Sequence, residues 1–220
     1  MIINPNSDLE MTAIIQSNVE KYAKGEFEVV CKATLGASKF IGSYEDISKS
    51  VTGMKELVYK NEKDFDGFII ACGADPNLDL IKEITVKPVV GIAEASMKIA
   101  SMLGHRFAII QTTKRFVPNK EALIYKYHME GLGFAKVSKK GISNYRNEEE
   151  IFNTAKLAIE EDGAEVIILS CAGMTGLDRI LEKKLGVPVL DGVICGLIIV
   201  TGLIKYGVST SKIGRFKLRR

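Results

Sequence analysis

Two of the four cysteines in this 220-residue chain occupy matching positions and have the chemistry to move a proton on and off carbon. Cys72 and Cys171 each follow an apolar run, and each is followed by small residues, in the sequences CGA (72–74) and CAG (171–173). Two thiols on opposite sides of one carbon can invert its configuration, because a thiolate removes a proton from one face while a thiol donates to the other. The pair therefore indicates two-base proton transfer.

The other two cysteines, Cys31 and Cys195, lie in an expected strand and an expected apolar helix, where a free cysteine is usually part of the core. No CxxC pair occurs, and His105 and His128 are far from any cysteine in the sequence, so zinc-ligand spacing is absent. A chain of this length buries an adequate core without disulfides. We predict no metal site and no disulfide framework.

The elements that must position the two thiols alternate between short apolar runs and longer helical patterns, which is typical of an α/β fold with parallel strands. In the first half we expect strands at residues 1–3, 27–31, 65–71 and 88–92, and helices at 9–23, 47–65 and 94–103. In the second half we expect strands at residues 107–110, 134–137, 165–170 and 187–190, and helices at 119–132, 148–161 and 193–204.

The two halves can be aligned on each other. FDGFIIACGA (65–74) matches AEVIILSCAG (164–173), which places the two cysteines 99 residues apart, and the proline-led strands that follow are 100 residues apart. A constant offset predicts two similar lobes related by pseudo-twofold symmetry, each a small parallel sheet flanked by helices. We place the lobes at residues 1–98 and 99–200, and we expect the segment from about 200 to 220 to pack back on the first lobe.

Ligands of parallel α/β sheets bind outside the carboxyl ends of the strands, where both cysteines fall. Backbone N–H groups exposed by the small residues there stabilise a thiolate and can hold a substrate oxyanion. Short polar side chains follow the first strand of each half, in NPNS (4–7) and QTT (111–113). Substrate binding and helix capping are equally good interpretations of these two loops.

Several classes of function are excluded by composition. The net charge of +3 is too small to indicate a nucleic-acid partner, which would be bound by a concentrated basic face. Neither GxxxxGK[ST] nor GxGxxG occurs, so the sequence predicts no nucleotide cofactor. The most apolar stretch, residues 193–204, is about 18 Å long as a helix, against the ~30 Å that spans a bilayer. With no targeting segment at residues 1–6, we expect a cytoplasmic protein with a small-molecule substrate and no membrane partner.

Five motifs in order give the chain a resemblance to a known group. They are INPNS (3–7) followed by Met11 and Thr12, ACGADPN (71–77), PVVGIAEAS (88–96), GHRFAIIQTT (104–113) and SCAGM (170–174). The chain resembles the hydantoin and allantoin racemases of the aspartate/glutamate racemase superfamily, over roughly residues 1–207.

The resemblance implies a cofactor-independent racemase, an isomerase whose catalytic acid/base pair is Cys72 and Cys171. It also implies a homo-oligomer and a substrate that is a cyclic amide or an amino-acid derivative. By motif match, the residues that offer backbone N–H groups to the oxyanion are Gly73 and Gly173. Those that hold the ring or its carbonyls are Asn6, Thr112 and Thr113.

Two departures leave the identity of the ring open. Relatives often carry glycine where this chain has Asn77 and Ser170. The amino-acid racemases typically have Cys-Asn-Thr at both cysteines, which is absent here and argues against free aspartate or glutamate. The alternatives are an aspartate/glutamate racemase, an enzyme like maleate isomerase in which one cysteine attacks covalently, and a non-catalytic small-molecule binding protein.

Overall fold

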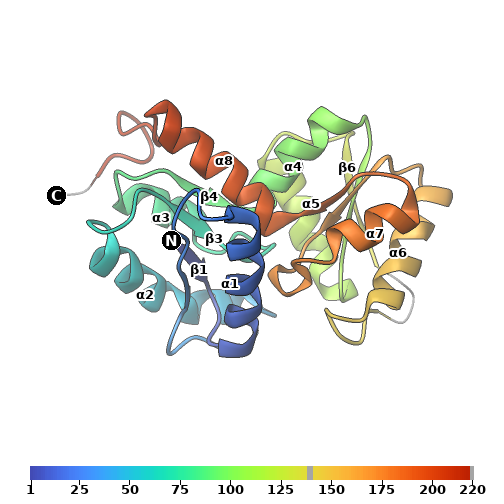
Figure 1. The fold of residues 1–220 in the computed structure, drawn as a ribbon, viewed down its shortest axis with the longest axis horizontal. Coiled ribbons are helices and arrows are strands. Elements are labelled where there is room, and N and C mark those ends of the chain that lie inside the picture. The colour runs from blue at the N-terminus through green and yellow to red at the C-terminus, as the bar shows by residue number, and fades with distance from the viewer. Residues whose placement is uncertain (138–140, 219–220) are drawn as a thin grey trace.

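The protein folds into two parallel four-stranded sheets (Figure 1), in a computed structural model that describes residues 1–137 and 141–218. The first sheet has the order β2-β1-β3-β4 and consists of β1 (Ile2–Asn4), β2 (Cys31–Ala33), β3 (Phe68–Ile70) and β4 (Val89–Gly91). The second has the order β6-β5-β7-β8 and consists of β5 (Phe107–Ile110), β6 (Gly133–Lys136), β7 (Val166–Leu169) and β8 (Val189–Asp191).

The helices flank these sheets. They are α1 (Leu9–Ala23), α2 (Tyr44–Asn61), α3 (Leu78–Ile84), α4 (Ile92–Leu103), α5 (Val117–Lys126), α6 (Glu148–Glu160), α7 (Asp178–Leu185) and α8 (Gly192–Tyr206), with single 3₁₀ turns at η1 (Lys114–Phe116) and η2 (Ala172–Met174). Strand order and direction are the same in the two sheets, position for position. The fold class expected from the internal repeat is confirmed, while the lobe ranges of 1–98 and 99–200 stay a prediction.

The helix that follows the first sheet packs on the second. Along α4, Ala93, Met97 and Ala100 are buried in one cluster with Phe107 of β5 and Ile168 of β7. Burying this apolar face against the strands of the other lobe removes it from water, which favours the joined arrangement of the two sheets. The first lobe therefore depends on the second to cover its last helix.

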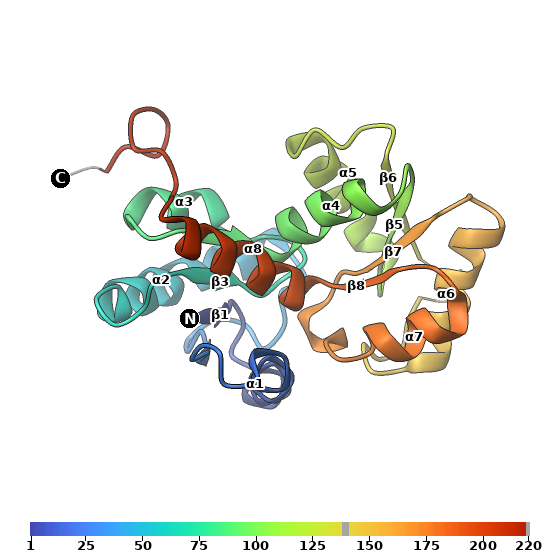
Figure 2. The same cartoon turned by 45° about the horizontal axis from the view of Figure 1, so that its top comes forward.

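The final long helix makes the reciprocal contact. Val193, Leu197 and Val200 of α8 are buried with Ile69 of β3 and Val90 of β4. Figure 2 shows α8 crossing from β8 to the first lobe, and α4 and α8 contact each other between the two sheets. Each half of the chain thus gives its last helix to the other half, and this exchange holds the two strand-end edges together.

Several expected elements differ in their bounds from the sequence pattern, most of all the helix expected at 119–132 and the strand expected at 27–31. The helix expected to reach residue 132 ends at Lys126, because His128 adopts a left-handed φ of 58° that breaks the helical hydrogen bonding. Strand pairing of β2 begins only at Cys31, directly after the Val30 carbonyl, which accepts a hydrogen bond from the Ile2 N–H (2.8 Å). The short helices α3 and α7 were not predicted, since seven or eight residues give little periodicity.

Among the described residues, no helix combines the length and the apolar character needed to cross a membrane.

Candidate active site

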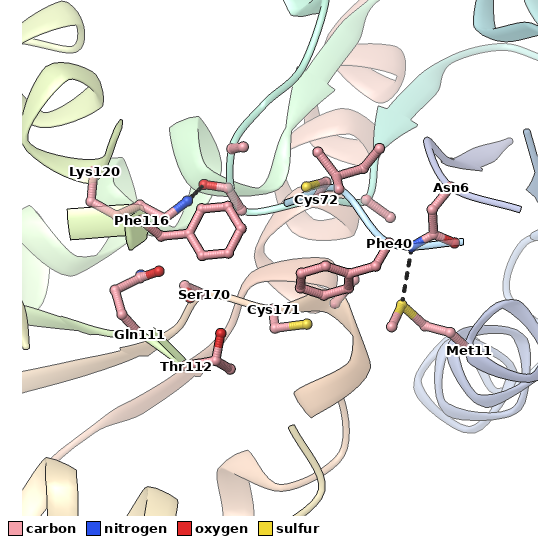
Figure 3. A pocket seen from close by; sticks show the side chains of 15 residues that line it. Asn6, Met11, Phe40, Cys72, Gln111, Thr112, Phe116, Lys120, Ser170 and Cys171 are labelled. Carbon is pink, nitrogen blue, oxygen red and sulfur yellow. Dashed lines mark hydrogen bonds between the residues drawn. The ribbon is translucent and has the colours of Figure 1, made fainter. Parts of the chain in front are cut away.

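The two thiols selected from the sequence lie in one pocket. Cys72 comes two residues after β3 and Cys171 two residues after β7, at the carboxyl ends of equivalent central strands. Both residues line one cavity, with about 490 Å³ of space between the atoms when the open solvent at its mouth is included. In Figure 3 the thiols come from opposite sides toward the middle of this space.

The pocket has two chemically different ends (Figure 3). One end carries side chains of the first lobe, namely Asn6, Met11 and Phe40. The other carries side chains of the second lobe, namely Gln111, Phe116 and Lys120. A ligand that contacts both thiols therefore also contacts both lobes.

Two aromatic rings meet across the pocket from opposite lobes. Phe40 lies between β2 and α2, and Phe116 lies in η1. Their ring centroids are 6.1 Å apart at an interplanar angle of 73°, which is the edge-to-face geometry preferred by aromatic pairs. Phe40 remains 44% exposed, so this pair forms part of the boundary between the pocket and solvent.

The loops that carry the thiols touch backbone to backbone. A Cβ atom at Gly73 would lie 1.8 Å from the carbonyl oxygen of Ser170, a separation that no side chain can adopt. Glycine at position 73 is therefore required for the approach of the two loops. Ser170 in turn donates a hydrogen bond from its hydroxyl to the Ile110 carbonyl (2.7 Å), which fixes the second loop on β5.

Burial raises the pKa of both thiols. The pKa of Cys171 rises to about 11, although the backbone N–H groups of Gly173 and Met174 act to lower it. Burial also raises the pKa of Cys72, against the effect of the Ala74 N–H. The expected stabilisation of a thiolate by backbone N–H groups is present, but loss of hydration outweighs it.

The loop after Cys72 is anchored by a buried carboxylate. Asp75 accepts hydrogen bonds from the backbone N–H groups of Ala93 (3.0 Å) and Glu94 (2.8 Å) at the start of α4. It also accepts one from the Tyr127 hydroxyl (2.7 Å), which belongs to the second lobe. Burial raises the pKa of Asp75 to about 6 despite these donors. One side chain thus connects the thiol loop, the exchanged helix α4 and the other lobe.

The loop after Cys171 is held in a similar way. Asp191 caps α8, accepting from an N–H of its first turn (2.8 Å), and it also accepts from the Thr175 hydroxyl. On the other side, Arg146 donates to the carbonyls of Gly173 (3.1 Å) and Thr175 (2.9 Å). Buried carboxylates at helix N-termini therefore anchor both thiol loops.

The structure brings five of the seven predicted site residues into this pocket, namely Asn6, Cys72, Gly73, Thr112 and Cys171. The other two do not line it. Thr113 is exposed, because its backbone leads outward into η1. Gly173 faces the Tyr145 ring, which lies 2.5 Å from where a Cβ at position 173 would be.

Two residues that depart from the relatives have clear structural roles. Asn77 adopts a left-handed φ of 57°, which asparagine tolerates better than most residues, and its side chain donates to the Ser50 hydroxyl (3.0 Å). Ser170 lines the pocket between the two thiol loops. Of the two departures, only Ser170 is in a position to contact a ligand.

Lys120 also lines the pocket, although it was not predicted from the sequence. It lies on α5, is 3% exposed and donates a hydrogen bond to the Gly73 carbonyl. Burial lowers the pKa of Lys120, whereas the neighbouring Cys72, Asp75 and Cys171 raise it. Its one sequence signal is a lysine at a position that helical periodicity assigns to the buried face, beside Leu123 and Ile124.

Comparison with known proteins agrees with this geometry. The family model described as Asp/Glu/Hydantoin racemase matches residues 1–198. A hydantoin racemase of Pseudomonas sp. (strain NS671) is 37% identical, with 98% of this chain and 90% of the relative covered. A structure of allantoin racemase from Klebsiella pneumoniae has a TM-score of 0.93 at 30% identity, covering 100% of this chain and 92% of that one. The structure of allantoin racemase from Pseudomonas fluorescens has a TM-score of 0.87 at 27% identity, covering 100% of this chain and 96% of that one.

Proposed function

The chain belongs to the Asp/Glu/hydantoin racemase family and is an isomerase, and from that premise we propose that it racemises a hydantoin-type substrate at ring carbon C5. The substrate is a 5-substituted hydantoin or allantoin, and the reaction needs no cofactor because only protons move. One observation carries the proposal, namely that Cys72 and Cys171 line a single pocket from the ends of equivalent strands.

The proposed reaction begins with one cysteine as thiolate and the other as thiol. The thiolate removes the proton from C5, and the electron pair of the C–H bond moves onto the adjacent C4 carbonyl to give an enolate. The opposite thiol then donates its proton to the other face of C5. The product is the mirror image of the substrate, and the charges of the two cysteines are exchanged. The reverse reaction starts from that exchanged state.

The enolate oxygen carries the developing negative charge and needs hydrogen-bond donors. We assign this role to the backbone N–H group of Gly73, one residue after Cys72. Gly173, two residues after Cys171, does not line the pocket, and its N–H group acts on the Cys171 thiol instead. We assign Asn6 and Thr112 to the ring and its carbonyls, since both side chains line the pocket. Thr113 has no part in this assignment because it is exposed.

Solvent deuterium exchange with each pure enantiomer of a 5-substituted hydantoin tests the reaction directly. The unaltered enzyme exchanges the C5 proton of both enantiomers and abolishes their optical rotation. Cys72→Ser and Cys171→Ser each lower racemisation about 10²- to 10⁴-fold, the usual contribution of a positioned acid/base group. Each single variant retains slow exchange of one enantiomer only, because one thiol remains on one face.

Cys31→Ser is the matched control, since Cys31 lies in β2 outside the pocket and its substitution should leave turnover unchanged. Near-normal turnover of either pocket variant would overturn the two-thiol mechanism. Turnover of free aspartate or glutamate in place of hydantoins would favour the amino-acid racemase alternative. A covalent thioether adduct on Cys72 or Cys171, seen by mass spectrometry, would favour chemistry like that of maleate isomerase. Ligand binding without any deuterium incorporation would indicate a non-catalytic binding protein.

A further inference from the structure

One end of the pocket contains a buried lysine without a carboxylate partner. Lys120 is 3% exposed, and no carboxylate in the described part of the chain lies within ion-pair distance of its ammonium group. Asp75 raises the pKa of Lys120 through its charge, but it already accepts three hydrogen bonds from other groups. A buried charge that lacks a partner is costly, and burial lowers the pKa of Lys120, so an anionic ligand that stabilises the ammonium form would bind favourably here.

The hydrogen bonds of Lys120 do not use all of its donors. Its ammonium group has three N–H bonds, and it donates to the Gly73 carbonyl and to the Asn119 side-chain oxygen (3.3 Å). Neither acceptor carries a charge. Among the described residues, Lys120 thus has acceptors for two of its three N–H bonds, and the third is available to a ligand.

Gln111 supplies a second unused donor at the same end. It is 2% exposed, lines the same pocket, and its Nε2 atom has no hydrogen-bond partner among the described residues. Leaving a buried amide unpaired is costly, and a bound acceptor would remove that cost. Figure 3 shows the Lys120 and Gln111 side chains on the same side of the two thiols, with the Phe116 ring beside them.

We propose that Lys120 and Gln111 form a carboxylate-binding subsite, and that the preferred substrate is a hydantoin whose C5 substituent ends in a carboxylate. This inference rests on the proposed function for the position of C5 between the thiols. One carboxylate oxygen accepts from the Lys120 ammonium group and the other from Gln111 Nε2. The ring then lies toward Asn6 and Met11, at the end of the pocket that carries no charged side chain.

A resting thiolate is not the partner that Lys120 lacks. Burial raises the pKa of Cys72 and raises that of Cys171 to about 11, so both are mainly thiols at neutral pH. An ammonium group that served only to create the thiolate would affect every substrate equally. A carboxylate subsite affects only substrates that carry the charge, and this difference separates the two roles.

The test compares two substrates of the same shape, 5-(carboxymethyl)hydantoin and its neutral isostere 5-(carbamoylmethyl)hydantoin. We expect a higher kcat/KM for the acid with the unaltered enzyme. Lys120→Met should lower the acid-to-amide ratio of kcat/KM about 100-fold, since it removes one partner of a buried charged pair. Gln111→Leu should lower the same ratio to a smaller extent, because it removes an uncharged donor.

Lys126→Met is the matched control. Lys126 lies six residues further along the chain and is exposed, so the variant loses the same charge without altering the pocket and keeps the ratio of the unaltered enzyme. An equal loss on acid and amide in Lys120→Met would overturn the subsite, and so would a preference of the unaltered enzyme for the amide.

Calorimetric binding to the double variant Cys72→Ser/Cys171→Ser separates this proposal from the racemase reaction. Tighter binding of the acid than of the amide, lost on adding Lys120→Met, supports the subsite even if no hydantoin is racemised. Racemisation of the amide alone, with no preference in binding, leaves the racemase proposal standing and overturns the subsite. Absence of both binding and turnover would overturn both proposals.

Discussion

The ionisation of two buried thiols governs the proposed chemistry at the scale of single residues. A base must be a thiolate, whereas burial favours the neutral thiol at both Cys72 and Cys171. The two groups also interact, since a charge on Cys72 raises the pKa of Cys171 further. The pair therefore loses its protons in two separate steps, and the state between the steps has the one thiolate and one thiol that the reaction needs.

We expect kcat/KM to rise with pH through neutrality, about tenfold per pH unit while the pair still holds both protons. Burial raises the pKa of both thiols, so the first ionisation of the pair lies on the alkaline side of neutrality and the fraction of enzyme with one thiolate grows with pH. The rate declines again only when the second thiol ionises, because no thiol is then left to donate a proton. The measurement is a pH–rate profile with a substrate that does not titrate in this range. The Cys31→Ser variant should give the same profile, and a flat profile from pH 6 to 9 would contradict this picture.

At the scale of secondary structure, the strand-to-helix connections place the thiols. Asp75 joins the Cys72 loop to the N-terminus of α4, and its carboxyl is protonated in the folded protein up to a pKa of about 6. In the unfolded chain the same group ionises near 3.8. Between these values the folded protein holds a proton that the unfolded chain has lost. The free energy of unfolding therefore contains a contribution that falls as pH rises from about 4 to about 6.

Asp75→Asn removes this contribution. In the unaltered protein this contribution to the free energy of unfolding falls by about 3 kcal/mol between pH 4 and 6, because the pKa of Asp75 is about 6 in the folded protein and 3.8 in the unfolded chain. We expect the variant to lack this fall. Urea unfolding at several pH values measures it. Asp66→Asn, which removes an exposed carboxylate, should retain the slope of the unaltered protein. An unchanged slope in Asp75→Asn would show that Asp75 titrates as it does in the unfolded chain.

At the scale of the whole molecule, the active pocket exists only because two lobes face each other. The exchanged helices α4 and α8 bury their apolar faces on opposite sheets, and the Tyr127 hydroxyl reaches Asp75 across the interface. At the mouth, Phe40 of one lobe contacts Phe116 of the other. These contacts hold the two thiol loops in one pocket, and in the proposed reaction they would limit the access of water to the enolate.

Phe40→Ala should lower kcat/KM about 3- to 10-fold, which corresponds to the loss of one edge-to-face aromatic pair. Because Phe40 is 44% exposed, the midpoint of thermal unfolding should change little. Steady-state kinetics and a thermal melt measure the two effects. Tyr59→Ala, at an exposed aromatic residue on α2, is the control and should affect neither. A large loss of stability in Phe40→Ala would assign the ring a role in folding instead.

The fold class and the thiol pair were accessible from the sequence because both depend on local patterns. Apolar runs bounded by small residues predict buried parallel strands, and the strand that ends at Cys72 has a counterpart 99 residues later. A repeated strand end is a local feature that tertiary contacts do not have to create. For the same reason the sequence pointed to Asn6 and Thr112, which follow the first strand of each half and line the pocket, while their role in substrate binding stays a prediction.

The remaining features depend on contacts between residues distant in the sequence, and only the tertiary structure decided them. Lys120 reads as one more lysine on an amphipathic helix until α5 packs and brings its ammonium group to the Gly73 carbonyl. The sequence of an apolar helix does not indicate which sheet will cover it, so hydrophobic periodicity could not predict the exchange of α4 and α8. Hydrophobic patterning selects which face of an element is buried, whereas the partner of that face is chosen by the packing of the whole chain.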